Sequence, residues 1–194
     1  MDFSSLAPCL LLAAPRLGDP NFERTVVLLA RHEEDGAIGW VLNGEAIAHV
    51  GELLSSAELV PEGVLVPDTA AFHRQARVGG PVAPRSGWIV YPSRARSFED
   101  EFDVGEEIAV CNRPEALSAV IHGEEPREFH LLLGYAGWGP GQLEAEVKEG
   151  SWLPAVLSPR LVLETPADGL FDAAFREATG TSPDLFNGKV WARA

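Results

Sequence analysis

The chain has 194 residues, of which 46% are hydrophobic and 23% are charged, as is usual for a folded globular protein. Its 29 Asp and Glu against 15 Lys and Arg give a formal net charge of −14. That charge disfavours direct nucleic-acid binding, which depends on cationic side chains that neutralise phosphates. No apolar run reaches the roughly 20 residues that a membrane-spanning helix needs. Asp2 precedes the first basic residue, Arg16, unlike the basic start of a secretory signal, so we expect a cytoplasmic protein.

The first half of the chain predicts strands joined by tight turns, and one helix. Residues 9–14 and 25–30 are short apolar runs typical of buried strands. Residues 33–36 form a charged turn ending in glycine, so 25–30 and 37–42 are expected to pair as a hairpin. Apolar residues recur at helical spacing over 45–59, which predicts an amphipathic helix there.

The second half predicts further short elements. Asn112 and Thr165 are placed to cap helices, the second with Pro166 at its first position, and Gly123, Gly150 and Gly180 to end helices. The expected strands are 77–82, 88–91, 107–111, 128–133 and 161–164. One helix is expected over 140–149 and two others follow residues 112 and 165, with an irregular tail over 181–194. These elements predict an α+β fold in a single domain over 1–194, with a curved, mostly antiparallel, barrel-like sheet flanked by helices.

Recognised catalytic and metal-binding patterns do not occur in the sequence. The five histidines show no metal-ligand spacing, and no serine sits in a G-x-S-x-G elbow, so we expect no metal site and no cofactor. Cys9 and Cys111 lie far apart, which favours two buried thiols in a reducing compartment over a disulfide. Cys9 lies in an apolar run, where a thiol is usually inert.

Two glycine-rich segments have both a structural and a functional interpretation. Residues 134–144 hold four glycines and two aromatic residues between an expected strand and an expected helix, so their backbone N–H groups could face an anion. The same pattern also fits a tight turn that admits close packing of aromatic rings. Gly79-Gly80-Pro81 has the same two interpretations. The five tryptophans are expected to pack in the core or at its edge.

Several segments, in this order, resemble the bacterial AlgH/YqgE family over roughly residues 5 to 178. They are Leu12-Ala13-Ala14-Pro15, Asp19-Pro20-Asn21-Phe22-Glu23-Arg24-Thr25-Val26-Val27, Gly36-Ala37-Ile38-Gly39-Trp40-Val41-Leu42-Asn43, Gly79-Gly80-Pro81-Val82, Leu133-Gly134-Tyr135-Ala136-Gly137-Trp138, Gly141-Gln142-Leu143-Glu144 and Trp152-Leu153. The chain departs from the family at Asn43-Gly44-Glu45, where the family commonly has Asn, a basic residue and Pro.

The resemblance implies an α+β fold in a bacterial cytoplasm, and it supplies no catalytic residue, ligand or cofactor. The family is often labelled as transcriptional regulators, by association with exopolysaccharide control. Because this chain is acidic, we expect any regulation to run through a protein or a small anionic ligand and not through direct DNA contact.

These observations predict a non-enzymatic regulatory or binding protein; the alternative is a hydrolase-type enzyme with a site at the glycine-rich loops. Arg24 is the natural cation for an acidic ligand, but a salt-bridged strand end explains it equally well. The candidate ligand or partner surface comprises Asp19, Phe22, Arg24, Gly79, Gly80, Tyr135, Trp138, Gly141 and Gln142.

Overall fold

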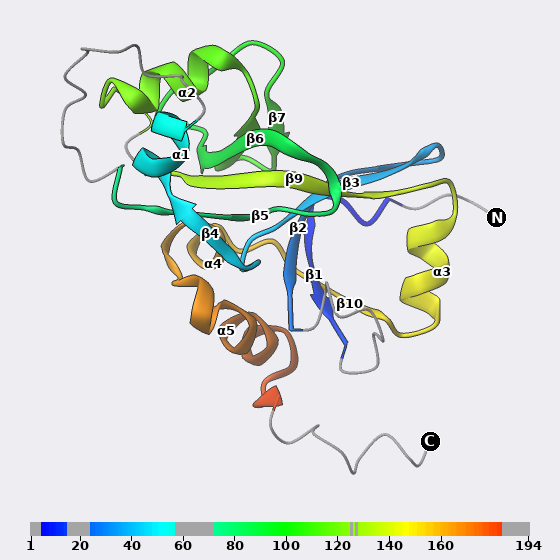
Figure 1. Ribbon diagram of the computed structural model, residues 1–194. Coiled ribbons are helices and arrows are strands. Elements are labelled where there is room, and N and C mark those ends of the chain that lie inside the picture. The colour runs from blue at the N-terminus through cyan, green and yellow to red at the C-terminus, as the bar shows by residue number, and fades with distance from the viewer. Residues whose placement is uncertain (1–4, 15–23, 57–71, 125, 127, 184–194) are drawn as a thin grey trace. The chain divides into compact units, whose positions relative to one another are not determined.

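The structure is a computed structural model that describes residues 5–14, 24–56, 72–124, 126 and 128–183. The chain divides into two compact units, one of residues 1–43 with 136–194 and the other of residues 44–135 (Figure 1). The described residues form ten strands and five helices, and every strand pairing is antiparallel except that of β5 with β9. The predicted fold class is confirmed as a mostly antiparallel sheet with helices, and the sheet is not closed within the described residues.

The first unit is built on five neighbouring strands. Their order is β10-β1-β2-β3-β9, and β9 contributes only its last residues, 136–138, to this unit. The predicted strands over 9–14, 25–30 and 37–42 are confirmed, and so is the hairpin that joins the last two. The bounds are Cys9–Ala13 for β1, Val26–Glu33 for β2, Gly36–Val41 for β3, His130–Trp138 for β9 and Trp152–Ala155 for β10.

Both faces of β1 are buried, which explains its uninterrupted apolar sequence. Successive strand residues point to opposite faces, so Leu11 joins a core cluster with Leu143 of α3, while Leu10 lies beside Leu161 of α4. Helix α3 spans Gln142–Lys148 and contacts β3 and β10, whereas α5, Ala167–Thr179, contacts β1 and β2 (Figure 1). Helix α4, Pro159–Glu164, packs against α5.

The second unit covers one face of its sheet with the two helices α1 and α2. Its core joins alternate residues of β6 and β8, such as Ile89, Tyr91 and Cys111, to Ala116 and Val120 of α2. Residues 130–135 of β9 belong to this unit and pair with β5 and β6. The other elements are β4 Ala46–His49, α1 Val50–Ser56, β5 Gln75–Val78, β6 Val82–Pro92, β7 Phe102–Val104, β8 Ile108–Cys111 and α2 Pro114–Ile121.

Three sequence predictions are corrected by pairing and packing. Residues 46–49 form strand β4 and not the start of a helix, because they pair with β5; α1 begins only at Val50. Residues 161–164 belong to helix α4, in which Leu161 and Val162 are both buried. The predicted loop over 134–138 is the end of β9, paired with β3 and β6.

The predicted helix ends are only partly right. Arg113 and Pro166, and not Asn112 and Thr165, stand at the N-caps of α2 and α5, and neither makes a side-chain capping bond. The terminal glycines are confirmed: Gly123, Gly150 and Gly180 follow α2, α3 and α5 in the left-handed conformation. Of the predicted irregular tail over 181–194, residues 184–194 lie outside the described residues.

Candidate functional site

Arg24 links the start of β2 to helix α5. Its guanidinium forms an ion pair with Asp172 and lies 4.8 Å from the ring centroid of Phe171. The Asn43 side chain holds the backbone on either side, donating to the Arg24 carbonyl at 2.9 Å and accepting from the Val26 N–H at 2.8 Å. Arg24 is thus a salt-bridged strand end, and its use by an acidic ligand stays a prediction. Asp19 and Phe22 lie outside the described residues.

Gly79, Gly80 and Tyr135 come together in the second unit, around the turn between β5 and β6. Gly79 donates its N–H to the Leu133 carbonyl at 2.7 Å, and both Gly79 and Gly80 are buried. A Cβ atom at Gly79 would lie 2.6 Å from the Gly134 carbonyl oxygen. Tyr135 pairs with Val82 and packs edge-on against Trp88, with ring centroids 6.0 Å apart. The glycines here therefore serve close backbone packing.

Trp138 and Gln142 belong to a hydrogen-bond network in the first unit that centres on Glu146. Glu146 Oε2 accepts the indole N–H of Trp138 at 2.9 Å and that of Trp152 at 2.7 Å, and Oε1 accepts the Gln142 amide at 2.8 Å. Gln142 in turn accepts the Gly139 N–H at 3.0 Å. Trp138 is only 7% exposed. These groups fasten α3 to the sheet, and Gly141 forms the turn before the helix.

The sequence motifs do not point to Glu146. Its one signal in the sequence is its position four residues after Gln142, where two side chains on one helix face can meet. The expected packing of the tryptophans in the core or at its edge is confirmed for Trp40, Trp88, Trp138 and Trp152, which are buried. Trp191 lies outside the described residues.

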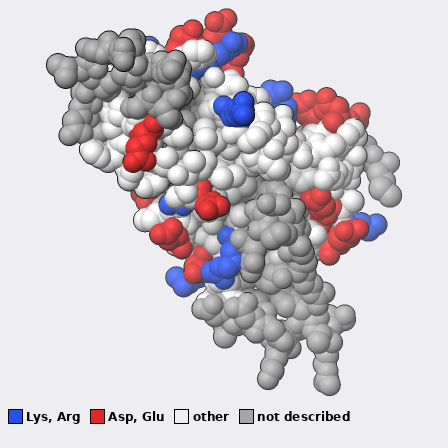
Figure 2. Space-filling model, in the orientation of Figure 1, with Lys and Arg blue, Asp and Glu red and all other residues white. Residues whose placement is uncertain are grey.

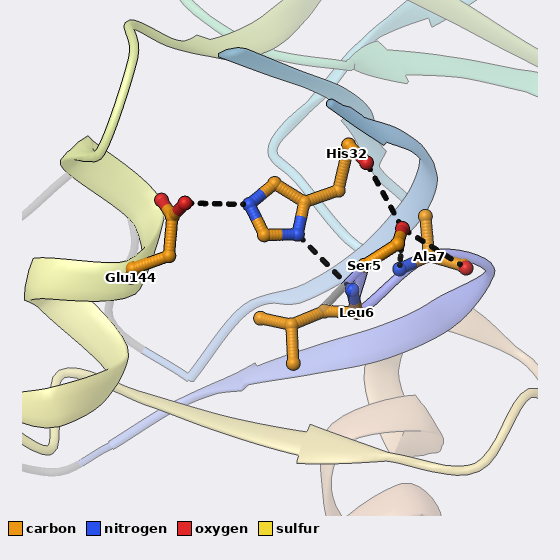
Figure 3. A network of polar contacts seen from close by, with 5 residues as sticks. All are labelled: Ser5, Leu6, Ala7, His32 and Glu144. Carbon is orange, nitrogen blue, oxygen red and sulfur yellow. Dashed lines mark hydrogen bonds and ion pairs between the residues drawn. The ribbon is translucent and has the colours of Figure 1, made fainter. Parts of the chain in front are cut away.

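His32 is buried in β2, and both of its ring nitrogens face groups of the protein (Figure 3). Nδ1 accepts the backbone N–H of Leu6 at 3.0 Å, and Nε2 lies 3.4 Å from Oε1 of Glu144 on α3. Ser5 donates its hydroxyl to the His32 backbone carbonyl at 2.9 Å and not to the imidazole. Ser5, His32 and Glu144 have the residue types of a hydrolytic triad and lie close together. The Ser5 hydroxyl, however, does not contact the His32 imidazole, which would have to deprotonate it.

Tyr91 and Glu101 form a second polar cluster, in the second unit. Tyr91 is fully buried and donates its hydroxyl to Glu101, which also accepts the Phe98 N–H at 2.8 Å and the Ser97 hydroxyl at 3.0 Å. Burial is the largest cause that raises the pKa of Tyr91, and the hydrogen bond to the Glu101 carboxylate raises it further. Glu101 therefore holds the loop over residues 93–101 onto the core of the second unit.

Both cysteines are buried, unpaired thiols, as the sequence predicts. Burial raises the pKa of Cys9 from 9.0 to about 12 and also raises that of Cys111. Such thiols are poor nucleophiles at neutral pH.

A cavity of about 190 Å³ opens in the first unit between β10 and helices α4 and α5. Among the described residues that line it, Glu177 is the only charged one, and it is ion-paired with Arg160 at 3.0 Å. The other lining residues are Leu10, Pro154, Ala155, Val156, Leu161, Ala174 and Ala178. Such a cavity fits an apolar group and offers no acid–base pair.

On the face shown in Figure 2, Lys and Arg are scattered among Asp and Glu and form no continuous basic patch over the described residues. Nor do three or more His, Cys, Asp or Glu side chains gather as metal ligands in that part of the chain. No helix among the described residues has the length and apolarity to cross a bilayer.

The fold is that of a mixed helix-and-sheet protein, and its polar clusters around Glu146, His32 and Glu101 connect strands, helices and loops of the chain to one another. The chain belongs to the AlgH-like family, whose model matches residues 10–183. It is 37% identical over 178 residues to a UPF0301 protein of Anaeromyxobacter sp. strain K, covering 89% of this chain and 88% of that one. A Burkholderia thailandensis UPF0301 protein is 34% identical over 181 residues, covering 93% and 91%.

Two solved structures resemble this one. The solution structure of the AlgH protein from Pseudomonas aeruginosa is 31% identical, with both chains fully covered and a TM-score of 0.76. A crystal structure of a Corynebacterium diphtheriae protein is 23% identical, covering 91% of this chain and 89% of that one, with a TM-score of 0.67. The second likeness concerns the fold alone.

Proposed function

We propose that the protein is a non-enzymatic binding or regulatory protein that acts through a protein or small-molecule partner. The observation that carries this proposal is that the clustered polar side chains contact other groups of the protein itself. Glu146 holds two indoles and an amide, and His32 faces Leu6 and Glu144, so each contributes to internal structure. A catalytic site instead needs polar groups that converge on a space where a substrate can sit.

Regulation of transcription, the label that the family often carries, would run through a partner and not through DNA. The net charge of −14 opposes contact with phosphates. The proposal also places the protein in the cytoplasm, where the unpaired thiols of Cys9 and Cys111 would stay reduced. A gel-shift titration with DNA at low and moderate salt tests the claim that regulation does not run through DNA. Salt-sensitive DNA binding would contradict that claim.

A thermal-shift screen tests binding of a small molecule. The panel comprises nucleotides, cyclic dinucleotides, sugar phosphates, small organic acids and divalent metals. A ligand at about 100 times its dissociation constant stabilises the fold by about 2.7 kcal/mol. Ala178→Phe fills the apolar cavity from an exposed helix position, and Ala145→Phe is the matched change on α3, away from the cavity. A shift that only Ala178→Phe abolishes would assign the ligand to the cavity.

The alternative is a hydrolase, which the sequence predicts at the glycine-rich loops. The observation that favours a hydrolase in the structure lies elsewhere, in the proximity of Ser5, His32 and Glu144 (Figure 3). Chromogenic carboxylic and phosphoric esters test this alternative. We expect no turnover above buffer. Turnover that His32→Ala abolishes in a folded variant would overturn the non-enzymatic proposal.

A further inference from the structure

The exposed apolar side chains are concentrated around one turn of the second unit. Four large apolar residues are exposed in the described part of the chain, and three of them belong to this unit: Ile47 at 43%, Val78 at 38% and Val82 at 38%. Val78 and Val82 flank the turn between β5 and β6, and Val78 donates its N–H to the Glu45 carbonyl, next to β4. We call these exposed apolar residues around the turn the turn patch: Ile47, Val78, Pro81, Val82, Ala83 and Pro84.

The backbone beneath the turn patch is held in place by tight packing. Val82 pairs with Tyr135 and Gly87 with Leu133, so residues 83–86 bulge out opposite Gly134 alone. Ala83 has a φ of 47°, and its carbonyl accepts the Ser86 hydroxyl at 2.8 Å. A non-glycine residue in this conformation is unfavourable and persists only where the surrounding contacts enforce it. The patch is therefore preorganised, which lowers the entropy cost of binding.

The charges at the edge of the turn patch are self-complementary. Glu45 adjoins it on the β4 side and Arg85 on the bulge side, and both are exposed. Arg85 makes no ion pair with another described residue. When a patch meets its own copy across a two-fold axis, each residue faces a different residue of the partner. A two-fold axis that passes between Glu45 and Arg85 brings each Arg85 towards the Glu45 of the other copy.

We propose that the turn patch binds a second copy of this chain in a two-fold dimer. Val78 and Val82 pack against the same patch of the partner, and Arg85 pairs with Glu45 of the partner subunit. The second copy fits better than an unrelated protein because one patch carries both charges of the pair. The patch is small and the net charge of −14 repels a like molecule, so the dimer is weak and concentration-dependent.

Sedimentation velocity of the full chain over a wide concentration range tests this proposal. We use about 0.15 M salt, where the Debye length of about 8 Å limits the repulsion between distant charges. We expect a reversible monomer–dimer equilibrium. Val82→Asp buries an unpaired charge in the contact and weakens association by about tenfold or more. Val156→Asp, the same change at an 88% exposed residue of the first unit, leaves it unchanged.

A monomer at every concentration, or equal association by the wild type and Val82→Asp, would overturn the proposal. Thermal melts of both variants should match the wild type because both side chains are exposed. A charge exchange tests the geometry: Arg85→Glu and Glu45→Arg each weaken the dimer, and the double variant restores it. A double variant weaker than either single one would overturn the pairing. The dimer does not rest on the proposed function, and failure of either leaves the other standing.

Discussion

The indole N–H of Trp152 donates to Oε2 of Glu146 at 2.7 Å, and this contact ties strand β10 to helix α3. Trp138 of β9 donates to the same oxygen, and its ring meets that of Trp152 edge-on with centroids 6.0 Å apart. One carboxylate thus satisfies two largely buried donors. Helix α3 has seven residues, too few to be stable alone, so its docking depends on the packing of the buried Leu143 and on this network.

We predict that Glu146→Ala destabilises the fold by about 2 kcal/mol, because it leaves two indole donors without their charged acceptor. Glu146→Gln keeps an oxygen for the indoles and should cost about half as much. Glu149→Ala, an exposed acidic residue three positions on, is the control and should change stability by less than about 0.5 kcal/mol. Urea unfolding monitored by tryptophan fluorescence measures all three. Equal stability of Glu146→Ala and Glu149→Ala would show that the network contributes nothing.

Gly134 and Gly141 have nearly the same backbone conformation, with φ of 73° and 72°, but different surroundings. A Cβ atom at Gly134 would lie 2.3 Å from the Gly80 carbonyl oxygen, whereas one at Gly141 would meet nothing within 4 Å. Gly141→Ala should cost only the left-handed strain of about 1–2 kcal/mol. Gly134→Ala adds a backbone clash and should cost clearly more, or prevent folding. Thermal and urea unfolding compare the two, and similar losses would contradict the close packing of Gly80 on Gly134.

The sequence predicted most strands because their apolar runs and turn residues are local signals. Leu10 and Leu11 are both buried, so the continuous apolar run of β1 is enough to predict a strand that is buried on both faces. The local periodicity predicts a helix over residues 46–49, whereas their strand conformation depends on pairing with β5, nearly thirty residues away. Such pairing leaves little trace in local periodicity.

The candidate site was only partly predictable for a related reason. The glycine and aromatic residues of 134–144 are unusual in composition, but composition does not show where a side chain points. Trp138 and Gln142 face Glu146, and Arg24 faces Asp172. Each of these partners is fixed by helix docking, which the sequence alone does not give.

The buried thiol of Cys9 predicts a loss of stability in alkali. Its pKa is raised by burial from 9.0 to about 12, so the unfolded chain releases this proton at lower pH than the folded one. The stabilisation from the protonated thiol is complete below pH 9 and is lost as the pH rises towards 12. Over that range one proton changes the free energy of unfolding by about 1.4 kcal/mol per pH unit.

Urea unfolding of the wild type and Cys9→Ala between pH 8 and pH 11 measures this contribution. Cys9→Ala should be less stable at pH 8 because of the cavity it leaves, but its stability should fall less steeply above pH 9. Part of the slope should remain, since burial also raises the pKa of Cys111 and Tyr91. Parallel curves for the two proteins would contradict the assignment to Cys9.

His32 and His122 should be opposite tautomers when neutral. A backbone N–H can only donate, so Nδ1 of His32, 3.0 Å from the Leu6 N–H, carries no proton, and Nε2 carries it towards Glu144. A carbonyl can only accept, so Nδ1 of His122, 2.8 Å from the Ser118 oxygen, is protonated. Long-range ¹H–¹⁵N correlation spectra distinguish the two forms. His32→Asn, whose amide oxygen can take the place of Nδ1, should keep the Leu6 contact better than His32→Gln, and the Leu6 amide shift reports it. A proton on Nδ1 of His32 would overturn this arrangement.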